Sequence, residues 1–180
     1  EAKEKIVIYA DYDCDGIPGA VILTDLLRLL NVPVEIYPHT KDFGVGVYIP
    51  QRNSEGYGLN LEAIKQFKEI GAKLIITVDL GIAAVAEVAQ AVVDGMDVII
   101  TDHHLPKLVL AGFASFDLPR AFAILNPKVD NYKEKMLCGA GVVFKLAQAF
   151  IKKYSEYFEI KEGAEKWMLD MAGLATLSDM

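Results

Sequence analysis

The segment KIVIYADYDCDG, residues 5–16, joins an apolar run to three aspartates that are spaced two residues apart. The run at 5–10 is rich in β-branched side chains and is typical of a short buried strand. Asp15 and Gly16 form a turn signal, and Pro18 is a residue that suits the first turn of a helix. The segment therefore predicts a buried strand that leads through a tight turn into a helix.

This alternation of strand and helix continues along the chain. Further strands are predicted at 34–37, 74–79, 97–102 and 121–127, and helices at 20–30, 60–70, 85–94, 137–153 and 163–177. Residues 39–58 are rich in Gly and lack periodicity, so they predict a long loop. Near-continuous apolar strands that alternate with helices indicate an α/β fold, in which helices flank both faces of a parallel β-sheet.

The composition excludes several classes of protein. Of the 180 residues, 53% are hydrophobic and 24% are charged, which is typical of a packed domain and not of a disordered chain. No apolar run reaches the roughly 18 residues that a membrane helix needs. The net charge of −7 argues against a nucleic-acid binder with a broad basic surface, but it allows a site in which metal ions offset the negative charge.

The cysteines and the chain ends give further expectations. Cys14 and Cys138 provide no disulfide framework, so the cytoplasm is the expected location, and Cys14 is expected to be a small buried hydrophobic residue. The chain starts at Glu1 rather than Met and ends at Met180 within an apolar pattern. We therefore expect residues 1–180 to be a single domain of a longer protein.

Three of the predicted strands end in an aspartate. IVIYAD ends at Asp11, LIITVD at Asp79 and VIITD at Asp102. In an open parallel sheet the ligand site lies outside the carboxyl ends of the strands, so the three acids are expected at one edge. A single aspartate in such a place is commonly the cap of the next helix. Three of them, one followed by two more acids and one by two histidines, indicate a functional site.

Carboxylates that gather in one place need a cation. Alternate residues of an extended chain share a face, which would bring Asp11, Asp13 and Asp15 together. The segment TDHHLP (101–106) adds another aspartate and two of the three histidines of the chain. Such mixed ligands suit Mn²⁺, Mg²⁺, Fe²⁺ or Zn²⁺, and the carboxylate majority favours the harder ions, Mn²⁺ first. These ligands are too many for one ion, so two ions about 3.5–4 Å apart are predicted.

Seven segments resemble one known family. Four of them resemble the N-terminal motifs of the DHH phosphoesterase superfamily: DYDCDG (11–16), TVDLGI (77–82), TDHHLP (101–106) and LATLSDM (174–180). Three others resemble its RecJ branch, the single-stranded-DNA exonucleases: VYIPQRNSEGYGLN (47–60), ILNPK (124–128) and LCGAGVVFKLA (137–147). The resemblance covers the chain in order, from the first strand to the last residue.

The resemblance implies a fold, a reaction and a set of ligands. The fold is the parallel-sheet DHH domain, and the reaction is metal-dependent hydrolysis of phosphodiester bonds without a covalent nucleophile. A centre of two Mn²⁺ ions is implied, with Mg²⁺ as the alternative. By motif position the metal ligands are Asp13, Asp15, Asp79 as the bridging carboxylate, His103 and Asp179, with Asp11 as a further ligand or a supporting residue.

Two residues of the DHH motif keep alternative roles. Asp102 either binds a metal ion or orients His103 through a hydrogen bond. His104 binds a metal ion, faces the scissile phosphate as an acid, or is a turn histidine without a catalytic role. Asp79, His103 and His104 are the candidate catalytic residues.

Further candidates for substrate binding lie elsewhere in the chain. Arg52 suits a bidentate phosphate contact, with an exposed, solvated arginine as the alternative. Tyr57 and Tyr48 suit base stacking, with aromatic plugs of the loop as the alternative. Gly139 and Gly141 begin a helix whose N–H groups suit a phosphate, with tight helix packing as the alternative.

Some features fall outside the family pattern. The second motif usually has a small or polar residue after its aspartate, whereas Leu80 stands here and is expected to alter the hydrogen bonding around Asp79. RecJ proteins carry a second, C-terminal substrate domain that these residues do not contain, so poor substrate binding is expected. His39 is interpreted as a loop histidine.

Three functions therefore compete. The first is a 5′→3′ exonuclease of single-stranded DNA in repair and recombination, with single-strand-binding or other repair proteins as partners and no membrane. The second is a phosphoesterase of short oligonucleotides, cyclic dinucleotides or pyrophosphate. The third is a non-catalytic DHH scaffold in a replication complex. The segments IPQR and EGYGL favour the first, and the intact acids of all four motifs argue against the third.

Overall fold

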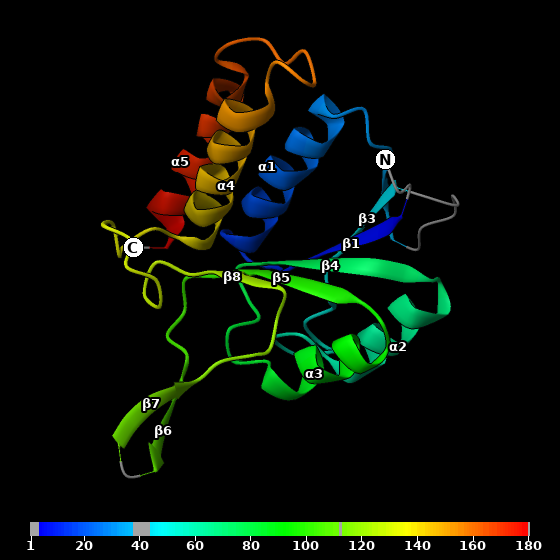
Figure 1. The fold of residues 1–180 in the computed structure, drawn as a ribbon, viewed down its shortest axis with the longest axis vertical. Helices are drawn as coiled ribbons and strands as arrows, with labels where there is room; N and C mark the ends of the chain where they lie inside the picture. The colour runs from blue at the N-terminus through cyan, green and yellow to red at the C-terminus, as the bar shows by residue number, and fades with distance from the viewer. Residues whose placement is uncertain (1–3, 38–43, 112, 180) are drawn as a thin grey trace.

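The computed structural model describes residues 4–37, 44–111 and 113–179. Its centre is a six-stranded sheet with the order β2-β3-β1-β4-β5-β8, in which all neighbouring strands are parallel (Figure 1). The strands are β1 (Lys5–Ala10), β2 (Val34–Ile36), β3 (Gly44–Tyr48), β4 (Ala72–Val78), β5 (Asp97–Thr101) and β8 (Ala123–Leu125).

Helices cover both faces of this sheet. On one face lie α1 (Gly16–Leu29), α4 (Gly139–Tyr154), the 3-10 helix η1 (Ala164–Met168) and α5 (Leu169–Ser178), and on the other lie α2 (Leu61–Glu69) and α3 (Val85–Val93) (Figure 1). Each face has its own hydrophobic cluster between helices and sheet. This arrangement confirms the predicted α/β fold.

The central strand β1 is buried on both faces because its residues alternate between the two clusters. Ile8 and Ala10 pack in the cluster under α1 and α4, whereas Val7 and Tyr9 pack in the cluster over α2 and α3. None of the four has exposed surface. Full burial of a large aliphatic side chain stabilises a fold by about 1.5–3 kcal/mol, so β1 is a firm support for the residues that follow it.

Tyr9 is also part of a group of four aromatic rings. Tyr9, Tyr37, Tyr48 and Phe67 form pairs whose ring centroids are 5.1 to 6.0 Å apart. The side chain of Tyr48 is buried in this group, and its hydroxyl contacts the Glu55 carboxylate. Tyr48 is therefore a core residue, which supports the aromatic-plug alternative over base stacking for this ring.

The structure differs from the predicted elements between residues 39 and 58. The strand β3 lies inside the predicted loop and pairs with both β1 and β2. Its sequence GVGVY concealed it, because glycines weaken the apolar pattern of a strand. His39, interpreted as a loop residue, lies outside the described residues.

A hairpin is a second difference from the prediction. The strands β6 (Lys107–Ala111) and β7 (Phe113–Asp117) pair in antiparallel fashion and project away from the sheet (Figure 1). The sequence of this segment lacks the alternation of polar and apolar residues by which hairpins are recognised. In addition, α1 begins at Gly16, two residues before Pro18.

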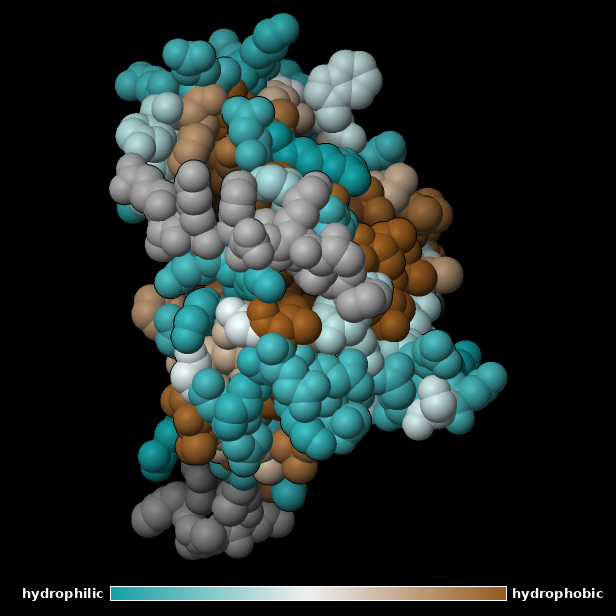
Figure 2. Space-filling model, turned by 90° about the vertical axis from the view of Figure 1, so that its right-hand side faces the viewer, coloured by the Kyte–Doolittle hydropathy of each residue, from teal (hydrophilic) through white to brown (hydrophobic). Residues whose placement is uncertain are grey.

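The surface is mixed in character. On the face shown in Figure 2, hydrophilic residues predominate at the top and across the lower middle, and a hydrophobic patch lies at mid-height on the right. Large hydrophobic side chains are also exposed on η1 and α5, including those of Trp167, Leu174 and Leu177. Within the ranges that the structure describes, no helix has the length and apolarity that crossing a membrane requires.

The start of α2 provides a test of the fold. The Asn60 side chain accepts a hydrogen bond from the Ala63 N–H at 2.7 Å and donates one to the Tyr9 hydroxyl at 3.0 Å. We expect Asn60→Ala to lower the free energy of unfolding by about 1–2 kcal/mol, because it removes the helix cap. Asn60→Ser keeps a capping oxygen and is expected to cost less. Urea unfolding of both variants measures the difference, and equal losses would contradict the capping role.

Candidate metal centre

Three neighbouring strands carry an aspartate just beyond their carboxyl ends. The ladder of the sheet continues into these residues: the Asp11 N–H donates to Val78, the Asp79 N–H to Thr101 and the Asp102 N–H to Leu125, at N···O distances of 3.1, 2.9 and 3.1 Å. All three aspartates are buried. The regular sheet therefore fixes the relative positions of these three residues, as the sequence pattern predicted.

The segment after β1 does not stay extended. The Asp13 carboxylate accepts hydrogen bonds from the N–H groups of Asp15 and Gly16 at 2.9 and 2.8 Å, which turns the chain directly into α1. Cys14 is exposed on this turn, which corrects the prediction that its side chain is buried. Asp11 and Asp13 thus come together through a turn and not through strand alternation, while Asp15 joins a different group of ligand atoms.

Asp15 connects α1 to the start of α4. Its two carboxylate oxygens accept hydrogen bonds from the N–H groups of Gly139 and Ala140, at 2.6 and 2.7 Å. A carboxylate at a helix N-terminus is stabilised by the helix dipole. The Gly141 N–H faces the sulfur of Cys138 at 3.4 Å. These N–H groups are therefore engaged within the protein, which differs from the phosphate contact predicted for Gly139 and Gly141.

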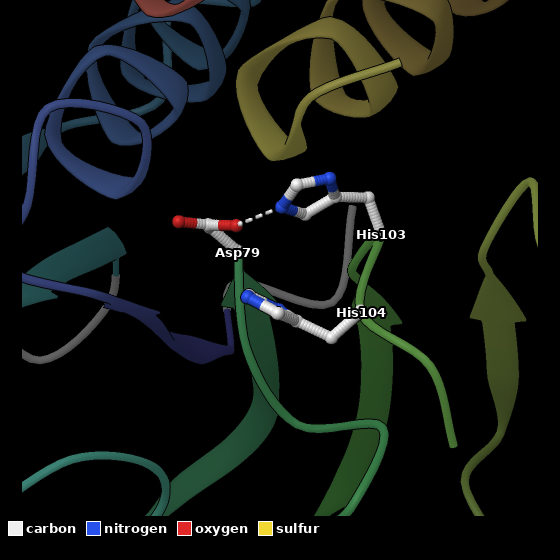
Figure 3. Close-up of side chains that lie close together, drawn as sticks. All are labelled: Asp79, His103 and His104. Atoms are coloured by element: carbon white, nitrogen blue, oxygen red, sulfur yellow. Dashed lines mark ion pairs between the residues drawn. The ribbon is translucent and has the colours of Figure 1, made fainter. Parts of the chain in front are cut away.

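Asp79 occupies the middle of the site. Its backbone has a φ of 62°, a left-handed conformation that is costly for residues other than Gly and is typical of functional turns. Gly139 packs directly against it, since a Cβ there would lie 2.4 Å from Asp79 Oδ1. The same buried Oδ1 forms an ion pair with Nε2 of His103 at 3.2 Å and has no hydrogen-bond partner in the described residues (Figure 3).

His103 lies among three carboxylates. Its Nε2 is 3.2 Å from Asp79 and 3.6 Å from Asp15, and its Nδ1 is 3.7 Å from Asp179. Burial alone lowers the pKa of His103, but the neighbouring Asp79 carboxylate outweighs it, so the pKa is raised. Burial also raises the pKa of Asp79. Both groups therefore hold protons more tightly than in water, because burial disfavours the charged carboxylate and the carboxylate favours the charged imidazole.

The ligand atoms form three compact groups. Within each group the nitrogen or oxygen atoms lie within 4.8 Å of one another. The groups are Asp11, Asp13 and Asp79; Asp15, His103 and Asp179; and Asp79, His103 and His104. The structure thus brings together seven of the residues singled out from the sequence, with Asp79 and His103 each shared by two groups.

Asp102 organises the turn that carries both histidines. One of its oxygens accepts hydrogen bonds from the N–H groups of His103 and His104 and lies 2.7 Å from Nδ1 of the His104 ring. The other oxygen accepts from the Ile82 N–H at 2.8 Å. Burial would raise the pKa of Asp102, but these hydrogen bonds lower it. Asp102 therefore orients the ring of His104, which corrects the prediction that it orients His103.

His104 lies at the open edge of the site. The hydrogen bond with Asp102 raises its pKa to about 8. Its ring is 6.2 Å from that of Tyr57, and both residues line a cavity of about 320 Å³ together with the turn at 81–84. The Arg52 side chain is exposed, and its guanidinium lies 5.6 Å from the centre of the Tyr12 ring. Tyr57 thus lies beside His104, and the predicted substrate contacts of Tyr57 and Arg52 stay predictions.

Two further residues support the site. Asn126, which the sequence did not single out, is buried and donates a hydrogen bond from Nδ2 to the His104 carbonyl at 2.9 Å. Its signal was the Asn-Pro pair directly after a strand, a common turn start. Leu80 points into the hydrophobic cluster over α2 and α3, while its carbonyl accepts a hydrogen bond from the Thr77 hydroxyl at 2.7 Å.

Comparison with known proteins identifies the family. The model of the "DHH family, N-terminal domain" matches residues 5–176. This chain belongs to the DHH family. The single-stranded-DNA-specific exonuclease RecJ of Bacillus subtilis is 39% identical to this DHH chain over 180 residues, which is 99% of the chain. A crystal structure of exonuclease RecJ bound to manganese superimposes on 99% of it, with a TM-score of 0.76 and 30% identity.

A third similar protein is RecJ from Thermus thermophilus, solved in complex with Mn²⁺, which matches 98% of the DHH chain with a TM-score of 0.70 and 28% identity. All three proteins are longer than this chain. The DHH chain spans 19% of the Bacillus subtilis relative, 39% of the manganese-bound structure and 22% of the Thermus thermophilus structure. The likeness therefore concerns the DHH domain of these exonucleases.

The pairing of Asp102 with His104 predicts a dependence on pH. Because the folded protein raises the pKa of His104 from 6.5 to about 8, this pairing stabilises the fold fully below pH 6.5 and ceases to do so as the pH rises through 8. We expect Asp102→Asn to lower the free energy of unfolding more at pH 6 than at pH 9. The difference between the two losses is expected to be only about 1 kcal/mol, because solvent screens the charge of the half-exposed His104 ring. Urea unfolding of the metal-free protein at both pH values measures this, and an equal loss would contradict it.

Proposed function

We propose that this edge of the sheet binds Mn²⁺, with Mg²⁺ as the alternative. A donor set of carboxylate oxygens with imidazole nitrogens suits these ions. The observation that carries the proposal is the buried Oδ1 of Asp79, whose partner in the described residues is His103 alone. A buried carboxylate oxygen is costly without a cation or several donors around it. The manganese in two similar RecJ structures supports the same choice.

We further propose two ions with Asp79 between them. Asp79 and His103 each belong to two of the three ligand groups, and the charge of six nearby aspartates exceeds what one divalent ion offsets. The first ion would be held by Asp11, Asp13 and Asp79, and the second by Asp15, His103, Asp179 and the shared Asp79. Asp102 is left out of both sets because it belongs to none of the three ligand groups and its oxygens bind the turn that it organises.

The proposed reaction is the hydrolysis of phosphodiester bonds in single-stranded DNA from the 5′ end. The RecJ relatives are named as single-stranded-DNA-specific exonucleases, and the chain resembles their DHH domain over nearly its whole length. When bound, the metal ions supply a Lewis acid that acidifies water and offsets charge on the phosphate.

The residues of the chain have complementary roles in this proposal. Asp102 holds the His104 ring through Nδ1, which leaves the other ring nitrogen to donate a proton to the leaving 3′ oxygen. Tyr57 would stack on a base from its place beside the cavity, and Arg52 would contact a phosphate near the first two aspartates. The cytoplasmic location and the interaction with single-strand-binding or other repair proteins remain predictions from the sequence.

The contact between Gly139 and Asp79 gives a test of metal binding. A Cβ at Gly139 would overlap the Asp79 carboxylate, whereas a Cβ at Gly173 on α5 would meet nothing within 4 Å. We expect Gly139→Ala to weaken Mn²⁺ binding at least about 10-fold, as displaced supporting groups do in metal sites. Gly173→Ala is the matched control and is expected to bind as the parent does. Calorimetric titration with Mn²⁺ measures both, and equal affinities would show that Asp79 is not a ligand.

The reaction is tested with a 5′-phosphorylated, 3′-labelled single strand of DNA in the presence of Mn²⁺. We expect shortening from the 5′ end, abolished by EDTA and reduced at least about 100-fold by Asp79→Ala. Asp97→Ala is the control, because Asp97 is exposed at the opposite end of β5.

The outcomes separate the competing functions. Digestion that begins at the 3′ end would contradict the proposed polarity. Bound Mn²⁺ without any shortening, together with hydrolysis of dinucleotides, would favour a phosphoesterase of short substrates. A chain that binds no Mn²⁺ would favour the scaffold.

A further inference from the structure

The proposed substrate and the proposed site carry charges of the same sign. Six aspartates surround the candidate centre, and a nucleic-acid strand brings one negative charge per phosphate. The metal ions would offset charge at the scissile phosphate. The neighbouring phosphates would still be repelled by the acidic site unless positively charged side chains of the protein bind them. A candidate cation for this role lies in the turn after β8, on the side of the site that carries His104.

This turn, residues 126–130, is tied directly to the DHH motif. The buried Asn126 donates from Nδ2 to the His104 carbonyl at 2.9 Å, while its Oδ1 accepts a hydrogen bond from the Lys128 N–H at 2.9 Å. One side chain thus joins the backbone of Lys128 to the backbone of His104. The position of Lys128 relative to the site is therefore set by two hydrogen bonds and does not depend on a free loop.

Further contacts make the turn rigid. The N–H groups of Val129 and Asp130 donate to the Asn126 carbonyl at 3.1 and 2.9 Å. The Lys135 ammonium donates to the Pro127 carbonyl at 2.6 Å and also contacts the Asp130 carbonyl. Proline limits the backbone further. A rigid support of this kind lowers the entropy that is lost when a side chain binds a ligand.

The Lys128 side chain has no acidic partner among the residues that the structure describes. In the ranges that the structure describes, no carboxylate lies within 4.0 Å of its ammonium, whereas the ammonium groups of Lys68, Lys135 and Lys145 all contact oxygen atoms of the protein. Lys128 therefore places a positive charge in a turn that Asn126 ties to the backbone of His104, at the edge of an acidic site.

We propose that the Lys128 ammonium binds a backbone phosphate of the single strand, adjacent to the phosphate that is hydrolysed. This inference rests on the proposed function, since it assigns a substrate contact at the same site. Lys128 and Arg52 would then contact the strand from the two sides of the centre, near His104 and near the first two aspartates. A phosphate contact carries no information about base sequence, which suits an enzyme that digests any single strand.

The test measures binding to a phosphorothioate-linked thymidine oligonucleotide, which resists hydrolysis, by fluorescence anisotropy in the presence of Mn²⁺. We compare the chain with Lys128→Gln, Lys128→Arg and Lys152→Gln. Lys152 is an exposed control in the last turn of α4, about 20 Å along the helix from the contact with Asp15. Affinity is measured over a series of salt concentrations, and Mn²⁺ binding of each variant is checked by titration.

The salt dependence identifies a phosphate contact. We expect Lys128→Gln to bind several-fold more weakly and to lower the slope of log affinity against log salt by about 0.7, the value for one single-strand phosphate. Lys128→Arg and Lys152→Gln are expected to keep the slope, and all variants are expected to bind Mn²⁺ equally. An unchanged slope in Lys128→Gln would overturn the inference, whether or not affinity falls.

Failure of the proposed function gives a different result. If the parent chain binds the oligonucleotide and Lys128→Gln matches it, only the role of Lys128 is wrong. If the parent chain binds Mn²⁺ but neither binds nor digests single strands, the proposed function is wrong and the role of Lys128 falls with it.

Discussion

Negative charge at the ends of three neighbouring strands is the constraint on which the rest of this structure depends. Asp11, Asp79 and Asp102 continue the hydrogen-bonded ladder of the sheet and are buried, so their carboxylates cannot turn away into solvent. A buried carboxylate must be met by donors, by a cation, or by a proton. The hydrogen bonds around this edge show which of these groups stabilises each carboxylate.

The fold places hydrogen-bond donors beside the carboxylates of Asp15 and Asp102 but not beside Oδ1 of Asp79. Asp15 receives two N–H groups from the start of α4, and Asp102 receives those of the turn that it organises. Asp79 differs, because Gly139 packs against it and His103 is its one partner in the described residues. The hydrogen bonding thus distinguishes the Asp79 carboxylate, which we propose as the ligand shared by both ions, from carboxylates that also bind backbone N–H groups.

The sequence predicted the parts of this site that depend on local pattern. Asp11 and Asp79 directly follow apolar runs that are rich in β-branched residues, so the strand pattern and the edge rule for parallel sheets were enough to place them. The hydrogen bonds between Asp15 and α4 join residues 124 and 125 apart, and no local pattern reveals which helix end approaches which acid. Similarly, the pattern could not decide that Asp102 orients His104, because that choice depends on how the turn folds back on the carboxylate.

Anomalous scattering from a crystal grown with Mn²⁺ tests the central claim most directly, because it locates the ions without reference to activity. The account predicts two peaks on either side of the Asp79 carboxylate, one beside Asp11 and Asp13 and the other beside His103 and Asp179. Peaks away from Asp79, or a site without any peak at saturating Mn²⁺, would contradict the view that this buried carboxylate is a metal ligand.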